Sequence, residues 1–399
     1  MAPTLADTLD SLAERLSQAA EGLRTGNLSL ETDQFQRMGL IKAGTDLIDA
    51  VSLPKDKFLV WLPHFTHITA LRLFIKWKAF AHIPVEDGAA ISYTELSRKL
   101  GADVSLITLV ANGSLKQVGA DGLAHTEFSK ALTTPNPIWA MVQLGFDSQM
   151  AAFSAMPRYF DQFGLATEPT DRLQTVVAFA EGRLGSTVWD INHSSEERLQ
   201  VFTIAMAGIE ELMPALGAYD LSWAVEEASK SADRAVVVDV GGGRGQALKG
   251  IFKTTPGLPR HRCVLEDLPE VVEAARRDDP ELAEVRMVAM DFFREQPVKG
   301  ALVYYMRRCL HDYSDDECVR MLRQIAGAMA ADSRLLVVET LLGAQPSPLQ
   351  VAMDFSMMAI SGKERTLEGF EVITGEAALK ITAVSQIPGG SAVIECVLA

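Results

Sequence analysis

The chain has 399 residues, 48% of them apolar and 22% charged, which is the composition of a globular protein with room for about two or three domains. Its formal net charge of −15 argues against a nucleic-acid partner, because phosphate binding needs a surface rich in Lys and Arg. The sequence has no charge-free apolar run of about 20 residues and no basic start followed by an apolar block, so we expect neither a membrane span nor a signal peptide.

The N-terminal part of the chain is predicted to be helical. Leucines recur at helical spacing through residues 5–24, and Gly26 stands where such a helix would end. Two further helices are predicted over residues 30–51 and 65–80.

Residues 92–132 predict two short helices followed by a hairpin. Ser92 and Glu95 have the spacing of a capping box, and GADG at 119–122 suits a hairpin turn. Helix, helix and hairpin together are typical of a winged helix. The second helix, VSLITLVANGSL, contains no Arg or Lys, so we expect a structural or dimer-forming role rather than DNA binding.

The segment TTPNP, at 133–137, predicts a boundary between a first domain of residues 1–135 and a second of 136–399. Methionines and aromatic residues are frequent in the helical stretch 137–221, and we interpret them as core. From residue 234 onward strands and helices alternate. The predicted strands are AVVVDV (235–240), RCVLE (262–266), VRMVAMD (285–291), ALVYYM (301–306) and RLLVVET (334–340). Apolar strands separated by amphipathic helices predict an α/β domain with a Rossmann-like, doubly wound parallel sheet.

The cysteines and two of the histidines predict no metal site. Cys263, Cys309, Cys318 and Cys396 lack CxxC spacing, so we expect reduced thiols and a cytoplasmic location. His64 and His67 lie on one face of a helix, but no carboxylate or cysteine stands near them in sequence to complete a site.

A glycine-rich turn follows the first of these strands, in the stretch AVVVDVGGGRG. Its glycines are Gly241, Gly242, Gly243 and Gly245, and glycine lets a backbone approach a ligand closely. Asp267 stands 22 positions after Gly245, close to the spacing of about 20 expected of a carboxylate that binds a ribose. Asp267 is equally suited to cap the helix that begins at Leu268 and Pro269, and the two roles are compatible.

The turn does not match the dinucleotide fingerprint, because Gln246 and Arg244 occupy positions where the two possible frames need glycine. Asp291 and Phe292 add an acid and an aromatic ring at the end of another strand. Acids around an adenosine pocket suit a cationic ligand without phosphates, such as S-adenosylmethionine.

Six motifs in order resemble those of fungal small-molecule O-methyltransferases, which are similar to the caffeate-type plant enzymes. They are VVVDVGGGRG, VLEDLPEVVEAAR, MDFFREQPVKGA, YYMRRCLHDYSDDE, RLLVVET and SGKERT. The resemblance implies an obligate homodimer formed through the N-terminal module, substrate-binding helices after residue 136, and S-adenosylmethionine converted to S-adenosylhomocysteine. It places Gly241, Gly243, Asp267, Asp291, Phe292 and Arg307 around the donor, with Arg308 as the alternative to Arg307.

The same resemblance makes His311 the general base and Glu339 and Glu364 its flanking acids. A phenol, with a pKa of about 10, is only about 0.1% ionised at neutral pH, so a positioned base is needed. The sequence also places His311 after a predicted sheet strand and before a capping box of Ser314 and Glu317. Each role has an ordinary alternative: a loop or capping histidine for His311, a strand-end carboxylate in water for Glu339, and an ion pair with Lys363 or Arg365 for Glu364.

The sequence therefore predicts an S-adenosylmethionine-dependent O-methyltransferase that acts on a hydroxyl of an aromatic or polyketide-type secondary metabolite. The alternative is a pericyclase or cyclase on the same scaffold that uses the donor non-reactively, and a non-catalytic regulator is a third hypothesis. The chain also departs from the family: its second winged-helix helix is shorter, and LEGFEV follows GKERT at once where a further helix is normal.

Overall fold

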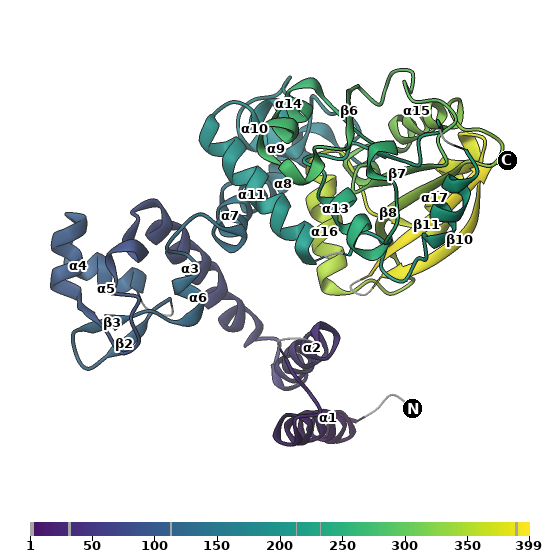
Figure 1. Cartoon of the computed structure of the whole chain (residues 1–399). Helices are drawn as coiled ribbons and strands as arrows, with labels where there is room; N and C mark the ends of the chain where they lie inside the picture. Colours follow the sequence, from purple (N-terminus) through teal and green to yellow (C-terminus); the bar gives the residue numbers. More distant parts are fainter. Residues whose placement is uncertain (1–3, 31–32, 112–113, 213, 232, 388–389) are drawn as a thin grey trace. The chain divides into compact units, whose positions relative to one another are not determined.

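The computed structural model describes residues 4–30, 33–111, 114–212, 214–231, 233–387 and 390–399 (Figure 1). The chain divides into two compact units, residues 1–126 and 127–399. In the described part of the chain, all four cysteines are buried and free.

The first unit begins with three helices, α1 (Leu5–Thr25), α2 (Gln34–Val51) and α3 (Lys57–Lys76). The helix predicted over residues 5–24 is confirmed as α1, with Gly26 in the left-handed conformation at its end. The predicted start of the second at residue 30 is wrong, because Asp33 caps α2 by accepting the backbone N–H of Gln36; residues 31 and 32 lie outside the described residues. The predicted third helix is wrong at both ends: α3 begins eight residues earlier, despite Pro63 inside it, and stops before the short 3-10 helix η1 (Ala79–His82).

Helix α3 is apolar but only partly buried. Its C-terminal half packs into the unit through Ala70, Leu71, Phe74 and Ile75. Large apolar side chains of its N-terminal half are exposed, namely Phe58, Leu59, Trp61, Leu62 and Phe65. Among the described helices it alone is long and apolar enough to cross a membrane, with a mean hydropathy of 1.3 over its most apolar window. A single such helix is weak evidence for a span, because core helices and signal sequences meet the same criteria.

The rest of the first unit has the predicted order of helix, helix and hairpin. Its elements are β1 (Ile91–Ser92), α4 (Tyr93–Leu100), α5 (Val104–Ala111), β2 (Lys116–Val118) and β3 (Gly122–Ala124). Ser92 caps α4 by accepting the N–H of Glu95, and Gly119 adopts φ 64° in the turn between β2 and β3. Residues 112 and 113 of the predicted second helix lie outside the described residues. The likeness to a winged helix stays a prediction.

The second unit opens with the predicted helical stretch. Its elements are α6 (Glu127–Lys130), α7 (Pro137–Leu144), the π-helix η2 (Gly145–Met150), α8 (Ala151–Phe163), α9 (Val176–Ala180), α10 (Val188–Asn192), α11 (Glu196–Leu212) and α12 (Ser222–Ser229). Met156 and Tyr159 of α8 are buried in an apolar cluster, in agreement with the interpretation of this stretch as core, whereas Met141 is exposed and contradicts it.

The remainder is an α/β domain, as predicted. Its strands are β4 (Val237–Val240), β5 (Cys263–Asp267), β6 (Arg286–Ala289), β7 (Val303–Arg307), β8 (Arg334–Leu342), β10 (Leu379–Ile387) and β11 (Ser391–Leu398), paired in the order β10-β11-β8-β7-β4-β5-β6. Helices α13 (Gln246–Thr254), α14 (Pro269–Asp278) and α15 (Asp315–Ala326) connect the parallel strands, with 3-10 turns at η3 (Arg260–Arg262), η4 (Pro280–Leu282) and η5 (Leu310–Asp312). Successive residues of β4 join different apolar clusters, Val237 one and Val238 the other, so the sheet is buried on both faces.

The five predicted strands pair parallel to one another, as predicted. Strand β11 pairs antiparallel with both β8 and β10, which makes the sheet mixed (Figure 1). The predicted ends of these five strands lie within two residues of the observed ends.

A helix also follows the GKERT segment, contrary to the sequence-based expectation. After α16 (Pro348–Met358) and the short strand β9 (Arg365–Thr366), helix α17 (Leu367–Glu376) begins at once. Thr366 caps it by accepting the N–H of Gly369, and Phe370 and Ile373 are buried beneath it. LEGFEV is therefore the first part of a covering helix.

Candidate active site

The order in which the chain adds strands to the sheet reverses at β4, which pairs with β5 on one side and β7 on the other. In such sheets ligands bind beyond the carboxyl ends of the strands at this point. Gly241 and Gly242 follow β4 there, and both donate their backbone N–H to the carbonyl of Glu266, at 2.8 and 3.0 Å. A Cβ on Gly242 would lie 2.6 Å from Oδ2 of Asp239, and one on Gly245 would lie 2.4 Å from a methyl of Leu282. Side chains are therefore excluded from the turn at both positions.

Asp267 ends β5 and faces the glycine turn. Its Oδ2 accepts the N–H of Gly243 at 2.8 Å, and its Oδ1 accepts the N–H of Leu268 at 2.7 Å. Burial raises the pKa of Asp267, while these two N–H groups act in the opposite direction. Leu268, not Asp267, is the N-cap of α14 and α14 has no side-chain cap, so the alternative of Asp267 as helix cap is wrong.

The other residues predicted to hold the methyl donor differ in how they relate to the glycine turn. A Cβ on Gly241 would lie 3.6 Å from the ring of Phe292, so that ring packs against the turn. Asp291 accepts the N–H of Phe293 at 2.9 Å, a contact within its own loop. Arg307 is buried at the end of β7.

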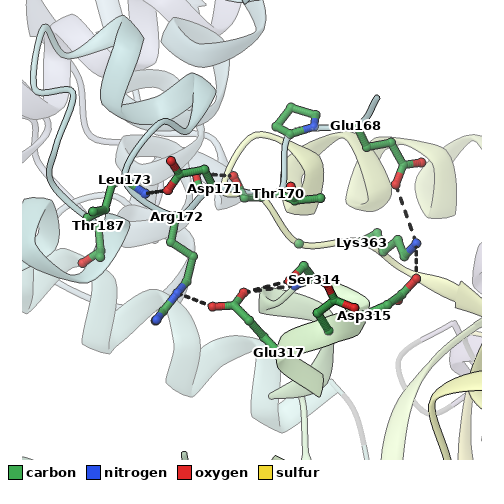
Figure 2. A pocket seen from close by; sticks show the side chains of 14 residues that line it. Glu168, Thr170, Asp171, Arg172, Leu173, Thr187, Ser314, Asp315, Glu317 and Lys363 are labelled. Atoms are coloured by element: carbon green, nitrogen blue, oxygen red, sulfur yellow. Dashed lines mark hydrogen bonds and ion pairs between the residues drawn. The ribbon is translucent and has the colours of Figure 1, made fainter. Parts of the chain in front are cut away.

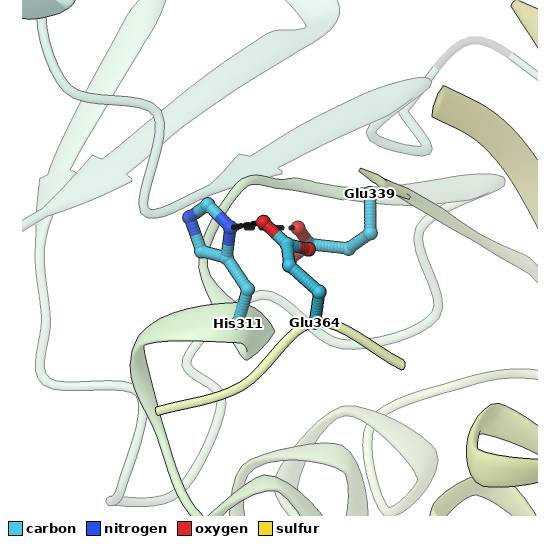
Figure 3. A group of neighbouring side chains, drawn as sticks. All are labelled: His311, Glu339 and Glu364. Atoms are coloured by element: carbon cyan, nitrogen blue, oxygen red, sulfur yellow. Dashed lines mark hydrogen bonds and ion pairs between the residues drawn. The ribbon is translucent and has the colours of Figure 1, made fainter. Parts of the chain in front are cut away.

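The turn after β7 brings together the three residues predicted to be catalytic. Nδ1 of His311 lies 3.1 Å from Oε1 of Glu364 and 3.7 Å from Oε2 of Glu339. Figure 3 shows the imidazole facing both carboxyl groups. Glu339 lies inside β8 and is buried, so the alternative of a strand-end carboxylate in water is wrong. The alternative ion pairs of Glu364 are also wrong: its neighbours in sequence, Lys363 and Arg365, both bind Asp315 instead.

Opposing effects act on the charge of His311. Burial disfavours the imidazolium, but the charges of Glu339 and Asp312 and the hydrogen bond with Glu364 outweigh it and raise the pKa of His311 to about 9. Asp312 approaches from the other side, with Oδ1 3.6 Å from Nε2, and Arg308 opposes the rise. The sequence offered Arg308 as the alternative to Arg307 around the donor, and in the structure its charge also lowers the pKa of His311.

Each glutamate makes hydrogen bonds through one oxygen, and its other oxygen makes none. Oε1 of Glu339 accepts the N–H groups of Cys309 and Leu310 at 2.9 and 2.8 Å. Oε2 of Glu339 and Oε2 of Glu364 are buried and make no hydrogen bond. In the described ranges, His311, Glu339 and Glu364 are also the one trio of metal-ligating side chains whose ligand atoms lie within 4.8 Å of one another.

Two residues that the sequence reasoning did not single out hold this turn in place. Arg365 is buried, and its guanidinium donates to the carbonyls of Leu310 at 2.9 Å and Tyr313 at 2.8 Å. Gly362 passes so close that a Cβ there would lie 2.0 Å from the carbonyl oxygen of His311. Both residues belong to the GKERT motif, in which the sequence analysis assigned a catalytic role to the glutamate alone.

A pocket of about 590 Å³ lies beside these loops. It is lined by residues 168–173, Thr187, 314–317 and 361–363, and Figure 2 shows Lys363 between Glu168 and Asp315, at 3.7 and 2.7 Å. Neither His311 nor the glycine turn contributes to its lining. The pocket is therefore separate from the predicted site residues.

Comparison with known proteins identifies relatives of the chain. Residues 171–380 match the family model of the O-methyltransferase domain. The chain is 34% identical to the methyltransferase cfoD of Aspergillus candidus, an alignment that covers 97% of this chain and 98% of the relative.

Two solved structures share the fold. OxaC, in complex with SAH and oxaline, has a TM-score of 0.80 at 22% identity, covering 98% of this chain and all of that one. A structure described as a pericyclic reaction enzyme has a TM-score of 0.78 at 22% identity, covering 96% of this chain and 99% of that one.

Proposed function

The chain belongs to the O-methyltransferase family, and from this we propose that it transfers the methyl group of S-adenosylmethionine to a hydroxyl of an aromatic or polyketide-type secondary metabolite, with His311 as the general base. The observation that carries the proposal is the contact of the His311 imidazole with Glu364 at 3.1 Å and Glu339 at 3.7 Å.

The glycine turn fits the donor. A turn without room for side chains admits an adenosine close to the backbone, and the carboxylate of Asp267 beside it is an acceptor for a ribose diol. The residues we propose to hold the donor are Gly241, Gly242, Gly243, Gly245, Asp267, Asp291, Phe292 and Arg307. When bound, S-adenosylmethionine supplies an activated methyl group on a sulfonium and leaves as S-adenosylhomocysteine, in keeping with the SAH in OxaC.

The chain's own part is to move a proton. Nδ1 of His311 faces the two glutamates, and Nε2 lies 3.6 Å from Oδ1 of Asp312; we propose Nε2 as the nitrogen that accepts the proton of the substrate hydroxyl. Glu364 and Glu339 fix the orientation of the ring and stabilise the imidazolium that forms. The site thus removes a proton that only about 0.1% of a phenol gives up at neutral pH.

The test is incubation of the chain with a methyl-labelled donor and a panel of hydroxylated aromatic and polyketide metabolites. We expect labelled product, and a loss of about 10²–10⁴ in kcat for His311→Ala. His193→Ala is the control, because His193 is exposed and bonds only its own helix. Label transfer that His311→Ala leaves unchanged would contradict the role of His311.

The second candidate function is a pericyclase or cyclase that uses the donor non-reactively. It is favoured by the fold shared with the pericyclic reaction enzyme and by the raised pKa of His311, which makes the ring a hydrogen-bond donor at neutral pH. The same incubation separates the two, because a rearranged product has unchanged mass and carries no label.

The N-terminal domain, residues 1–135, is proposed to form a homodimer. Its support is the exposed apolar half of α3, which a second copy would cover. No nucleic-acid partner is proposed, since the net charge is −15.

A further inference from the structure

The end of β5 is bonded to two segments of the candidate donor site. The backbone carbonyl of Glu266 accepts two N–H groups of the glycine turn, at 2.8 and 3.0 Å. Oε2 of the same residue accepts the side-chain amide of Gln296 at 2.7 Å. Gln296 belongs to the segment 291–297, which also contains Asp291 and Phe292. Glu266 therefore binds the glycine turn through its main chain and the segment 291–297 through its side chain.

The hydrogen bond between Gln296 and Glu266 lies in the interior of the protein. Both residues are fully buried. Oε1 of Glu266 makes no hydrogen bond, so the amide of Gln296 is the hydrogen-bond donor that this carboxyl group has. Burial removes water as a competing partner, and a buried carboxyl group left without any hydrogen bond is costly. The folded chain therefore strongly favours the pairing of these two side chains.

The hydrogen bonds inside the segment 291–297 give it a turn of its own. Asp291 accepts the N–H groups of Phe293 and Arg294, both at 2.9 Å. These bonds shape the turn without connecting it to the sheet. The side chain of Gln296 makes that connection, because its partner belongs to β5.

We propose that Glu266 and Gln296 are positioning residues for the methyl donor, whose hydrogen bond holds Asp291 and Phe292 beside the glycine turn before the donor binds; this rests on the proposed function, in which both segments bind S-adenosylmethionine. The ring of Phe292 also packs against the turn. Apolar contact has no preferred direction, however, whereas a hydrogen bond fixes the segment at one point. A site that is formed for only part of the time binds its ligand more weakly by that fraction.

The test is calorimetric titration of the full chain with S-adenosylhomocysteine, together with thermal denaturation. In Gln296→Leu we expect the dissociation constant to rise about tenfold, as for a site that is formed a tenth of the time. Glu266→Gln should bind within about twofold of the wild type, because glutamine keeps an acceptor oxygen for the amide of Gln296. Unchanged affinity in Gln296→Leu would overturn the proposal.

Two further variants separate positioning from stability. Glu266→Leu combined with Gln296→Leu removes both polar partners, which can be nearly neutral for stability; we expect an almost unchanged melting temperature and an affinity about tenfold lower. Glu395→Leu is the opposite control. Glu395 is a buried acid on β11, outside both donor segments, that accepts hydrogen bonds from Tyr219 and Arg334. Its loss should lower the melting temperature and leave the affinity unchanged. An affinity that follows the melting temperature in every variant would overturn the proposal.

Amide hydrogen exchange of the ligand-free chain gives a measurement that needs no donor. The N–H groups of Phe293 and Arg294 report on the segment 291–297, and we expect them to exchange about tenfold faster in Gln296→Leu than in the wild type. Glu395→Leu should leave their exchange unchanged.

The two measurements together distinguish this proposal from the proposed function. A wild type that binds no S-adenosylhomocysteine would overturn both. A wild type that binds it, with the same affinity and the same exchange rates as Gln296→Leu, would overturn the positioning role alone.

Discussion

The surroundings of His311 set the pH at which this residue can act as a base. Its pKa is raised to about 9, so at neutral pH most of the ligand-free chain carries the imidazolium, which cannot accept a proton. We therefore expect kcat/KM to rise about tenfold per pH unit from neutral pH and to level off near pH 9. The measurement is kcat/KM across this range with a saturating donor.

Glu364→Gln should move that profile to lower pH. The substitution removes a charge and a hydrogen bond that favour the imidazolium. Burial, which disfavours the imidazolium, is then less fully opposed, so the pKa of His311 falls. The matched control is Glu317→Gln, since Glu317 caps α15 and pairs with Arg172 away from the imidazole. A profile that does not move in Glu364→Gln would show that this carboxyl does not set the charge of His311.

Gly242 offers a second prediction at the scale of one residue. A Cβ at this position would lie 2.5 Å from a methyl of Leu265 and 2.6 Å from Oδ2 of Asp239, which is overpacking. We expect Gly242→Ala to lower the free energy of unfolding by roughly 1–3 kcal/mol and to weaken binding of S-adenosylhomocysteine. Thermal denaturation and calorimetry check this. Gly343→Ala should change neither, because no atom lies within 4 Å of its added Cβ.

At the scale of elements, the segment 362–365 and the turn 310–313 form one unit. Lys363 donates its N–H to the carbonyl of His311 at 2.9 Å, and Arg365 binds the carbonyls on either side. Glu364 lies between these two anchors. The bonds therefore fix the distance from Glu364 to the imidazole.

Arg365→Lys should impair catalysis more than binding. Lysine carries its three N–H donors on one nitrogen, so it does not reproduce the separated nitrogens of the planar guanidinium that reach both carbonyls. We expect kcat to fall by about 10²-fold, the loss typical of a misplaced catalytic group, with KM little changed and the apparent pKa of His311 lowered. Arg323→Lys is the control, because Arg323 donates two bonds to one carbonyl, that of Glu376, away from the site. Equal losses of stability and kcat in both variants would mean that Arg365 is merely structural.

The elements that the sequence predicted are those whose pattern is local. The parallel strands are continuous apolar runs such as 235–240, and these cannot avoid burial on both faces. The polar–apolar alternation of strand β10 breaks at Ala383 and Val384, and helix α17 contains two glycines and several β-branched residues, so neither has a strong local signal. Packing of Phe370 and pairing with β11 decide these elements, and both depend on residues distant in sequence.

The candidate site likewise has residues that the sequence predicted and contacts that it did not predict. The family motifs predicted His311, Glu339 and Glu364, and the structure places them together. The opposing contact of Asp312 and the free oxygens of the glutamates follow from three-dimensional burial, which no spacing in the sequence encodes.

At the scale of the whole molecule, the first unit leaves large apolar side chains of α3 exposed. Phe58, Leu59 and Trp61 stand on the N-terminal half of α3 with exposed fractions of 60%, 66% and 53%. Contiguous apolar patches of this kind mark interfaces with protein or membrane. This half of α3 has no acidic residue, and its Lys57 pairs with Asp49.

We therefore expect the chain, at 43.4 kDa, to sediment as a dimer, and Leu59→Glu to sediment as a monomer. A buried carboxylate would face apolar side chains of the second copy without a partner, which costs several kcal/mol. Sedimentation equilibrium measures this, and circular dichroism checks that the variant keeps its helices. Leu165→Glu is the control, because Leu165 is 82% exposed on a loop of the second unit. A wild type that stays monomeric but sediments with lipid vesicles would assign the apolar half of α3 to a membrane surface instead.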